Sequence, residues 1–136
     1  MRVNLVPRFV ILRHDPQQGD ARPLHWDLML EQADGLRTWA LAQQPSVGST
    51  VSAELLADHR KMYLDYEGLV PGDRGTVTQW DWGEFDWVAQ STDRILVRLI
   101  GQRLNCTMWL EPCQPDAAAP GQRWSVSFLS DFSGAC

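Results

Sequence analysis

Short segments in which every second residue is apolar recur along the whole chain, and this period restricts the fold more than any other feature. Residues 25–31 show the pattern most clearly. One face of a strand there would carry Trp26, Leu28 and Leu30, and the opposite face His25, Asp27, Met29 and Glu31. The segment is therefore predicted to be a strand with one apolar face.

The same period predicts a mainly β protein. Further strands are expected over residues 9–14, 36–42, 76–81, 84–88, 94–100, 106–111 and 124–129. Residues 52–59 fit either a short helix or a strand. Many short strands with few short helices favour a small closed or nearly closed β-barrel of mostly antiparallel strands, because closure removes exposed sheet edges. A chain of 136 residues has the size of one domain, so residues 1–136 are expected to form a single domain.

Turn-forming residues mark the expected connections. Asp34 and Gly35 predict a hairpin, and the proline- and glycine-containing residues 15–23 and 112–121 predict surface loops. The tryptophan-rich run at 79–87 could stack nucleic-acid bases, or it could form a hairpin that turns at Trp82-Gly83 and packs its aromatic side chains on the core. We favour the core interpretation, because aromatic burial dominates strand packing.

Charge and cysteine content narrow the function classes. A net charge of −5 and a pI near 5.0 argue against broad electrostatic binding of nucleic acid, but they allow an enzyme that contacts a few phosphates at a strand end. Cys106, Cys113 and Cys136 form no CxxC pair, so reduced cysteines in a cytoplasmic protein are expected, ahead of a zinc site or a disulfide framework. No signal peptide or membrane-spanning segment is recognisable, and no membrane partner is expected.

His25 and Asp27 form the most informative local pair. Residues two apart on a strand point the same way, so an imidazole and a carboxylate would emerge side by side. Such a pair suits Mn²⁺ or Zn²⁺, and His14, which shares the outward phase of the preceding predicted strand, could supply a third ligand if the two strands pair. By itself the spacing fits a hydrogen-bonded pair better than a metal site, because short motifs often match by chance.

A second group of chemically active side chains occupies residues 58–63. It places an imidazole (His59), two cations (Arg60 and Lys61) and a phenol (Tyr63) close together in sequence. Such a group could bind a phosphate and stabilise the charge that builds up on it during transfer. Taken by itself, the segment fits a solvated basic turn better.

Taken in order, these segments resemble the 3′-phosphoesterase domain of bacterial DNA ligase D and its stand-alone relatives. Residues 58–68 resemble the family's DHPxxYxxFEG stretch, and residues 71–81 resemble its glycine-rich lead into a strand that ends in Trp-Asp. The ordered set of similar segments is specific, and it comprises residues 9–14, 24–31, 35–40, 58–68, 71–81, 101–104 and 124–129.

The resemblance implies a small β-barrel that removes a 3′-phosphate or a 3′-terminal ribonucleoside from DNA, with Mn²⁺ as the preferred metal. By position, His14, His25 and Asp27 match the family's metal ligands. His59 and Tyr63 match the histidine and tyrosine that contact the phosphate. The implied partners are nucleic-acid 3′ ends, together with a DNA ligase or other repair proteins.

The sequence departs from the family pattern at positions that bear on catalysis. Met29 stands where the family has an arginine two residues beyond the metal-binding aspartate, and Leu12 replaces a glutamine. Val51 falls near the position of another family arginine, and the loop at 15–23 is longer than the family's. We also expect no counterpart of the family's N-terminal arm, which carries further acidic and basic active-site residues.

Three functions follow from these observations. The first is a metal-dependent phosphoesterase acting on DNA 3′ ends, in which His59 is an acid or a positioned donor and Arg60 or Arg37 replaces the missing arginine. The second is a module that keeps the metal site but, with Met29 in place of the arginine, only binds a phosphate, a nucleotide or a metal. The third is a structural partner in a repair complex.

Overall fold

The computed structural model describes residues 6–20, 22–91, 93–114 and 119–130. The strands are β1 (Arg8–Asp15), β2 (His25–Glu31), β3 (Leu36–Leu41), β4 (Thr50–Leu55), β5 (Gly68–Leu69), β6 (Thr76–Ser91), β7 (Arg94–Gly101), β8 (Asn105–Pro112) and β9 (Arg123–Ser130). A short 3₁₀ helix, η1, covers Lys61–Asp65.

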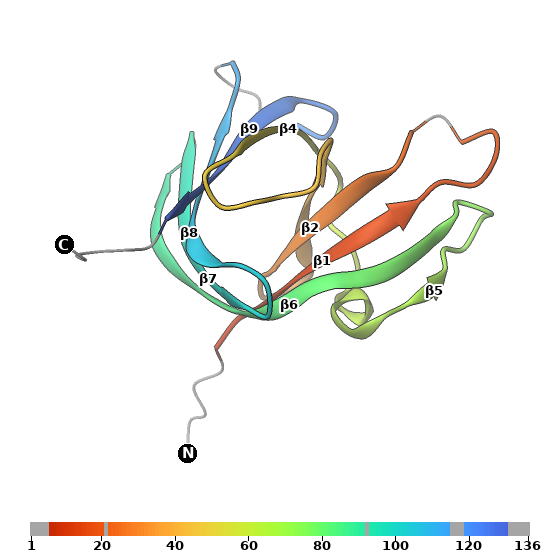
Figure 1. Cartoon of the computed structure of the whole chain (residues 1–136), viewed down its shortest axis with the longest axis horizontal. Helices are drawn as coiled ribbons and strands as arrows, with labels where there is room; N and C mark the ends of the chain where they lie inside the picture. Colours follow the sequence, from red (N-terminus) through yellow and green to blue (C-terminus); the bar gives the residue numbers. More distant parts are fainter. Residues whose placement is uncertain (1–5, 21, 92, 115–118, 131–136) are drawn as a thin grey trace.

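Eight of these strands close into an antiparallel barrel in the order β1-β2-β3-β4-β9-β8-β7-β6, and β6 pairs back onto β1 (Figure 1). The short β5 adds to β6 outside this ring. The predicted mainly β, closed barrel is thereby confirmed. The ambiguous residues 52–59 begin in β4 and continue into an extended segment, where His59 forms an isolated bridge with Leu36.

The predicted hairpin with its turn at Trp82 and Gly83 is wrong, because β6 runs through both residues as one strand. One part of β6 pairs with β1 and the other with β7, so Gly83 lies opposite Phe9 on one side and Gly101 on the other. A Cβ at Gly83 would lie 2.0 Å from the carbonyl oxygen of Ile100. The glycine therefore permits a close approach of two strands instead of forming a turn.

Two hydrophobic clusters lie on opposite sides of the barrel wall. The larger cluster fills the barrel, and its largest side chains are Trp39, Trp124, Phe9, Phe85 and Phe128. Trp80 and Trp87 pack against it, as the core interpretation predicted, whereas Trp82 is exposed.

The smaller cluster lies on the outer face of β1 and β2 and comprises Val10, Leu12, Met29, Leu36, Val77 and Leu64 of η1. This arrangement confirms the predicted two faces of β2, because Trp26, Leu28 and Leu30 belong to the larger cluster and Met29 to the smaller. The outer face, which also carries His25 and Asp27, is itself buried, since η1 covers part of it. The candidate ligands therefore lie on the outside of the barrel, next to the smaller hydrophobic cluster.

Within the described part of the chain, no helix has the length and apolar character needed to cross a membrane.

Candidate functional site

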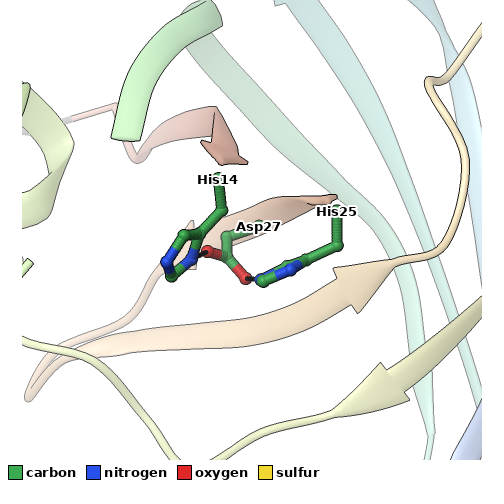
Figure 2. Close-up of side chains that lie close together, drawn as sticks. All are labelled: His14, His25 and Asp27. Carbon is green, nitrogen blue, oxygen red and sulfur yellow. Dashed lines mark hydrogen bonds and ion pairs between the residues drawn. The ribbon is translucent and has the colours of Figure 1, made fainter. Parts of the chain in front are cut away.

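Three side chains predicted as metal ligands meet where β1 ends and β2 begins (Figure 2). His14 and His25 are directly opposite each other in the β1–β2 pairing, and their ring centroids are 4.5 Å apart. Asp27 lies between the two rings: its Oδ2 is 2.9 Å from Nδ1 of His14, and its Oδ1 is 3.0 Å from Nε2 of His25. The three potential ligand atoms all lie within 4.8 Å of one another.

The outer nitrogen of each imidazole is held by a backbone carbonyl. Nε2 of His14 donates to the carbonyl oxygen of Arg74 at 2.6 Å, and Nδ1 of His25 donates to that of Pro23 at 2.9 Å. Because a carbonyl oxygen only accepts, each outer nitrogen carries a proton. In the neutral imidazole the inner nitrogen then presents its lone pair toward Asp27, and in the imidazolium form it donates a hydrogen bond to that carboxylate. This is the arrangement that orients histidine ligands at metal sites.

The inner atoms of the three side chains are close enough together to hold one cation. Oδ1 of Asp27 is buried and accepts no hydrogen bond from the described residues, although the lone pair of His25 Nε2 is close to it. Burial raises the pKa of the Asp27 carboxyl, but the interactions with His14 and His25 outweigh burial and lower that pKa to about 2. The hydrogen bond with Asp27 raises the pKa of His14 against the effect of burial. An anionic carboxylate and two imidazole nitrogens form a donor set that fits a borderline divalent metal ion.

The second predicted group lies across a cavity of about 440 Å³ from these three residues. His59, at the extended segment before η1, donates from Nδ1 to the carbonyl of Ala57 at 2.9 Å. Tyr63, on η1, packs edge-on against His59 with the ring centroids 5.8 Å apart. Six of the side chains singled out from the sequence line this central cavity: His14, His25, Asp27, His59, Arg60 and Tyr63.

The sequence of residues 17–111 matches the family described as the DNA Ligase D 3′-phosphoesterase domain. The chain belongs to this family. His14 precedes the matched segment, and the other predicted site residues lie inside it. One curated relative is the multifunctional non-homologous end joining protein LigD of Pseudomonas aeruginosa, which is 36% identical over 78 residues. That match covers 54% of this chain but only 9% of the relative's length.

The resemblance to this phosphoesterase family places Met29 at the position of an arginine. Met29 lines the central cavity and is 1% exposed, packed in the smaller cluster. Arg37, one of the two candidate replacements for the family arginine, is not at the cavity. Its guanidinium lies over Trp39 and Trp124, 5.2 and 5.5 Å from their ring centroids. That expectation is wrong because Arg37 follows the inward phase of β3.

Two cavity arginines were missed by the sequence reasoning. Arg22, from the β1–β2 loop, and Arg74, from the turn before β6, both line the central cavity together with Arg60. The glycines at positions 72 and 75 signalled a turn around Arg74, but nothing local showed that this turn folds back onto β1. Arg22 stands in the loop that is longer than the family's, where the resemblance offered no counterpart.

Proposed function

We propose that this chain is a metal-dependent phosphoesterase that acts on 3′ ends of DNA, removing a 3′-phosphate or a 3′-terminal ribonucleoside. Membership of the phosphoesterase family supports the reaction class. The observation that carries the proposal is the placement of an incompletely partnered N,N,O donor set opposite His59 and Tyr63 in one cavity. We propose Mn²⁺ as the metal, with Zn²⁺ or another divalent ion as alternatives, held by His14, His25 and Asp27.

The metal would supply charge neutralisation and polarise a phosphate oxygen. The chain's own residues would then bind and orient the phosphate. The guanidinium of Arg60 has no carboxylate within ion-pair distance among the described residues and can pair with an anion at the cavity edge. Nδ1 of His59 donates to the carbonyl of Ala57, so Nε2 faces the cavity and, in the imidazolium form, would donate a proton to the phosphate or to the leaving group. The Tyr63 hydroxyl is a second donor.

A second candidate function is a phosphate- or nucleotide-binding module without turnover. The buried Met29 favours it, because an apolar side chain offers no charge to a phosphoryl group at the position of the family arginine. Metal binding would be common to both candidates, so only turnover separates them.

We propose that DNA strand ends are the partners of this chain, and that it works together with a DNA ligase or other repair proteins. The name of the relative, a non-homologous end joining protein, supports this setting. We also propose a cytoplasmic location, which the cysteine pattern of the sequence, an odd number with no CxxC pair, supports.

The proposed reaction predicts that the full chain releases phosphate or ribonucleoside from a primer with a modified 3′ end in Mn²⁺. We expect His59→Ala to lower the turnover rate by about 10²- to 10⁴-fold, because a positioned proton donor contributes about that much. The assay follows a 5′-labelled primer on a denaturing gel, with and without chelator. Activity that persists in chelator would refute metal dependence, and Mn²⁺ binding without any turnover would establish the binding module instead.

Gly75 supplies a prediction about how His14 is oriented. Gly75 has φ +89°, and a Cβ there would lie 2.1 Å from the carbonyl oxygen of Asp15. Gly75→Ala must therefore shift the turn that carries the Arg74 carbonyl away from His14. We expect Mn²⁺ affinity to fall by about 10- to 100-fold, the usual effect of losing an outer partner of a ligating histidine.

Calorimetric titration with Mn²⁺ measures this effect, and Gly48→Ala is the matched control. Gly48 has a similar φ of +93°, but a Cβ added there would meet nothing within 4 Å. Both variants place an alanine at a positive φ, but only Gly75→Ala brings a Cβ into contact with the carbonyl oxygen of Asp15. Equal Mn²⁺ affinity in both would contradict the role of the Arg74 carbonyl.

A further inference from the structure

Among the described residues, three arginines on the outer side of the barrel have neither a carboxylate within ion-pair distance nor a tryptophan ring against the guanidinium. Most other cations of the described chain are partnered: Arg8, Arg13, Arg22 and Lys61 by carboxylates, and Arg37, Arg94 and Arg103 by tryptophan rings. Arg60, Arg74 and Arg123 have neither kind of partner within that part of the chain. An anion can pair with these three guanidinium groups, although the cavities that they line also contain the carboxylates of Asp20, Asp27, Asp58 and Glu54.

The same three arginines line consecutive cavities. The central cavity carries Arg60 and Arg74. A second cavity of about 480 Å³, here the bridging cavity, shares His14, Arg22, His25 and Arg74 with it. A third of about 270 Å³, the side cavity, shares Arg22, Pro23, His25 and Glu54 with the bridging cavity and is bounded by Arg123. The groove therefore runs from Arg60, past the two histidines, to Arg123.

The side cavity has the chemistry of a nucleotide subsite. Its lining includes the apolar residues Leu24, Ala40 and Ala42, which can contact a sugar or a base. Glu54 lies opposite Arg123 in the β4–β9 register, but its carboxylate pairs with Arg22 at 2.9 Å and is not within ion-pair distance of Arg123. Among the described residues, the Arg123 guanidinium donates to the hydroxyl of Ser52, at 3.1 Å, and pairs with no carboxylate, so it can bind a phosphodiester.

We infer that the side cavity binds the nucleotide that precedes the 3′ terminus of a DNA strand, with its phosphodiester on Arg123. The inference rests on the proposed function, which places the terminal phosphate beside His59 and Tyr63. From that position the strand follows the groove past His25, and the next phosphate reaches β9. The subsite gives affinity that a terminal nucleotide alone cannot obtain.

The test measures binding of 5′-fluorescein oligodeoxynucleotides with a 3′-phosphate and one, two or four nucleotides, by fluorescence anisotropy in chelator. The wild-type chain should bind the longer oligonucleotides more tightly than the single nucleotide. Arg123→Ala should lower the ratio between the affinities for the longer oligonucleotides and for the single nucleotide by about tenfold. It should also reduce the slope of log affinity against log salt for the four-nucleotide probe by about 0.7, the contribution of one single-strand phosphate contact.

Arg94→Ala is the matched control, because Arg94 is exposed on β7 and lies over Trp109, away from the three cavities. It should leave the gain with length unchanged. If the alanine variant does not fold, Arg123→Gln keeps the aliphatic stem and makes the same test. Three results would overturn the subsite. The Arg123 variant could lose no more affinity than the Arg94 control, or it could lose the same affinity for oligonucleotides of every length. The wild-type chain could also bind an equally charged acidic peptide more tightly than the oligonucleotides.

Because chelator is present, the binding result does not depend on turnover. A length-dependent effect of Arg123 in a chain that hydrolyses nothing in Mn²⁺ would refute the phosphoesterase proposal and uphold the subsite. Turnover in Mn²⁺ together with unchanged binding in the Arg123 variant would uphold the phosphoesterase proposal and refute the subsite.

Discussion

Asp27→Asn is expected to give a folded protein that no longer responds to Mn²⁺. The wild-type chain should gain about 2.7 kcal/mol of stability when Mn²⁺ is present at about a hundred times its Kd, because the ion binds only the folded state. The variant should gain almost nothing. The substitution removes the anion between the two imidazoles and leaves a neutral amide of the same shape.

The fold should survive this change, because the amide still has a hydrogen-bonding role. Its NH₂ group can donate to the lone pair of His25 Nε2, which now faces an oxygen without a hydrogen bond. We expect the metal-free variant to lie within about 2 kcal/mol of the wild type. Thermal melts with and without Mn²⁺ measure both quantities.

Asp65→Asn serves as the control for a lost carboxylate. Asp65 is an exposed residue whose side chain pairs with Arg8 at 2.6 Å, on η1. It should change neither the fold nor the Mn²⁺ response appreciably, since exposed ion pairs contribute little. Mn²⁺ stabilisation that persists in Asp27→Asn would show that the ion binds elsewhere.

Asp81→Ala is expected to cause the largest loss of stability, about 3–5 kcal/mol, because it leaves several buried donors unsatisfied. Asp81 is fully buried on β6 and accepts four backbone N–H groups, those of Trp82, Gln102, Arg103 and Leu104. Three of these donors lie in the tight connection between β7 and β8. One carboxylate thus holds the β7–β8 turn against β6 by hydrogen bonds, at the point where the pairing partner of β6 changes from β1 to β7.

Urea unfolding followed by tryptophan fluorescence tests this role. Asp81→Asn should lie between wild type and alanine, because its oxygen can keep acceptor contacts while its NH₂ group faces the N–H of a neighbouring residue. Asp86→Ala, an exposed carboxylate on the same strand, should change stability by no more than about 0.5 kcal/mol. If Asp81→Ala lowers the free energy of unfolding no more than Asp86→Ala does, the Asp81 carboxylate does not hold the β7–β8 turn against β6.

Much of the candidate site was predictable because strand geometry is local. A period of two places His25 and Asp27 on one side of β2 whatever the rest of the chain does. The position of His14 required one further assumption, that the neighbouring strands pair, and the β1–β2 register places it directly opposite His25. The grouping of His59 with Tyr63 followed from their closeness in sequence, and the family resemblance implied a contact with phosphate. The central cavity holds both side chains.

Predictions failed where a residue's role depends on a distant backbone. Gly83 has the local signature of a turn, but the neighbouring β7 strand makes it a point of close approach. Arg37 is near the site in sequence order, but the inward phase of β3 directs it to two tryptophan rings. Neither outcome is encoded in the few residues around the position.

By itself the sequence determined the strand period, the closed β-barrel class and the shared face of the imidazole and the carboxylate, because these follow from short-range geometry. The tertiary structure alone decided how the candidate metal centre is completed. The carbonyl that holds His14 belongs to Arg74, and Arg22 and Arg123 join the groove from separate loops and strands. Contacts between segments so far apart in the chain depend on how the barrel closes, and local propensity does not specify them.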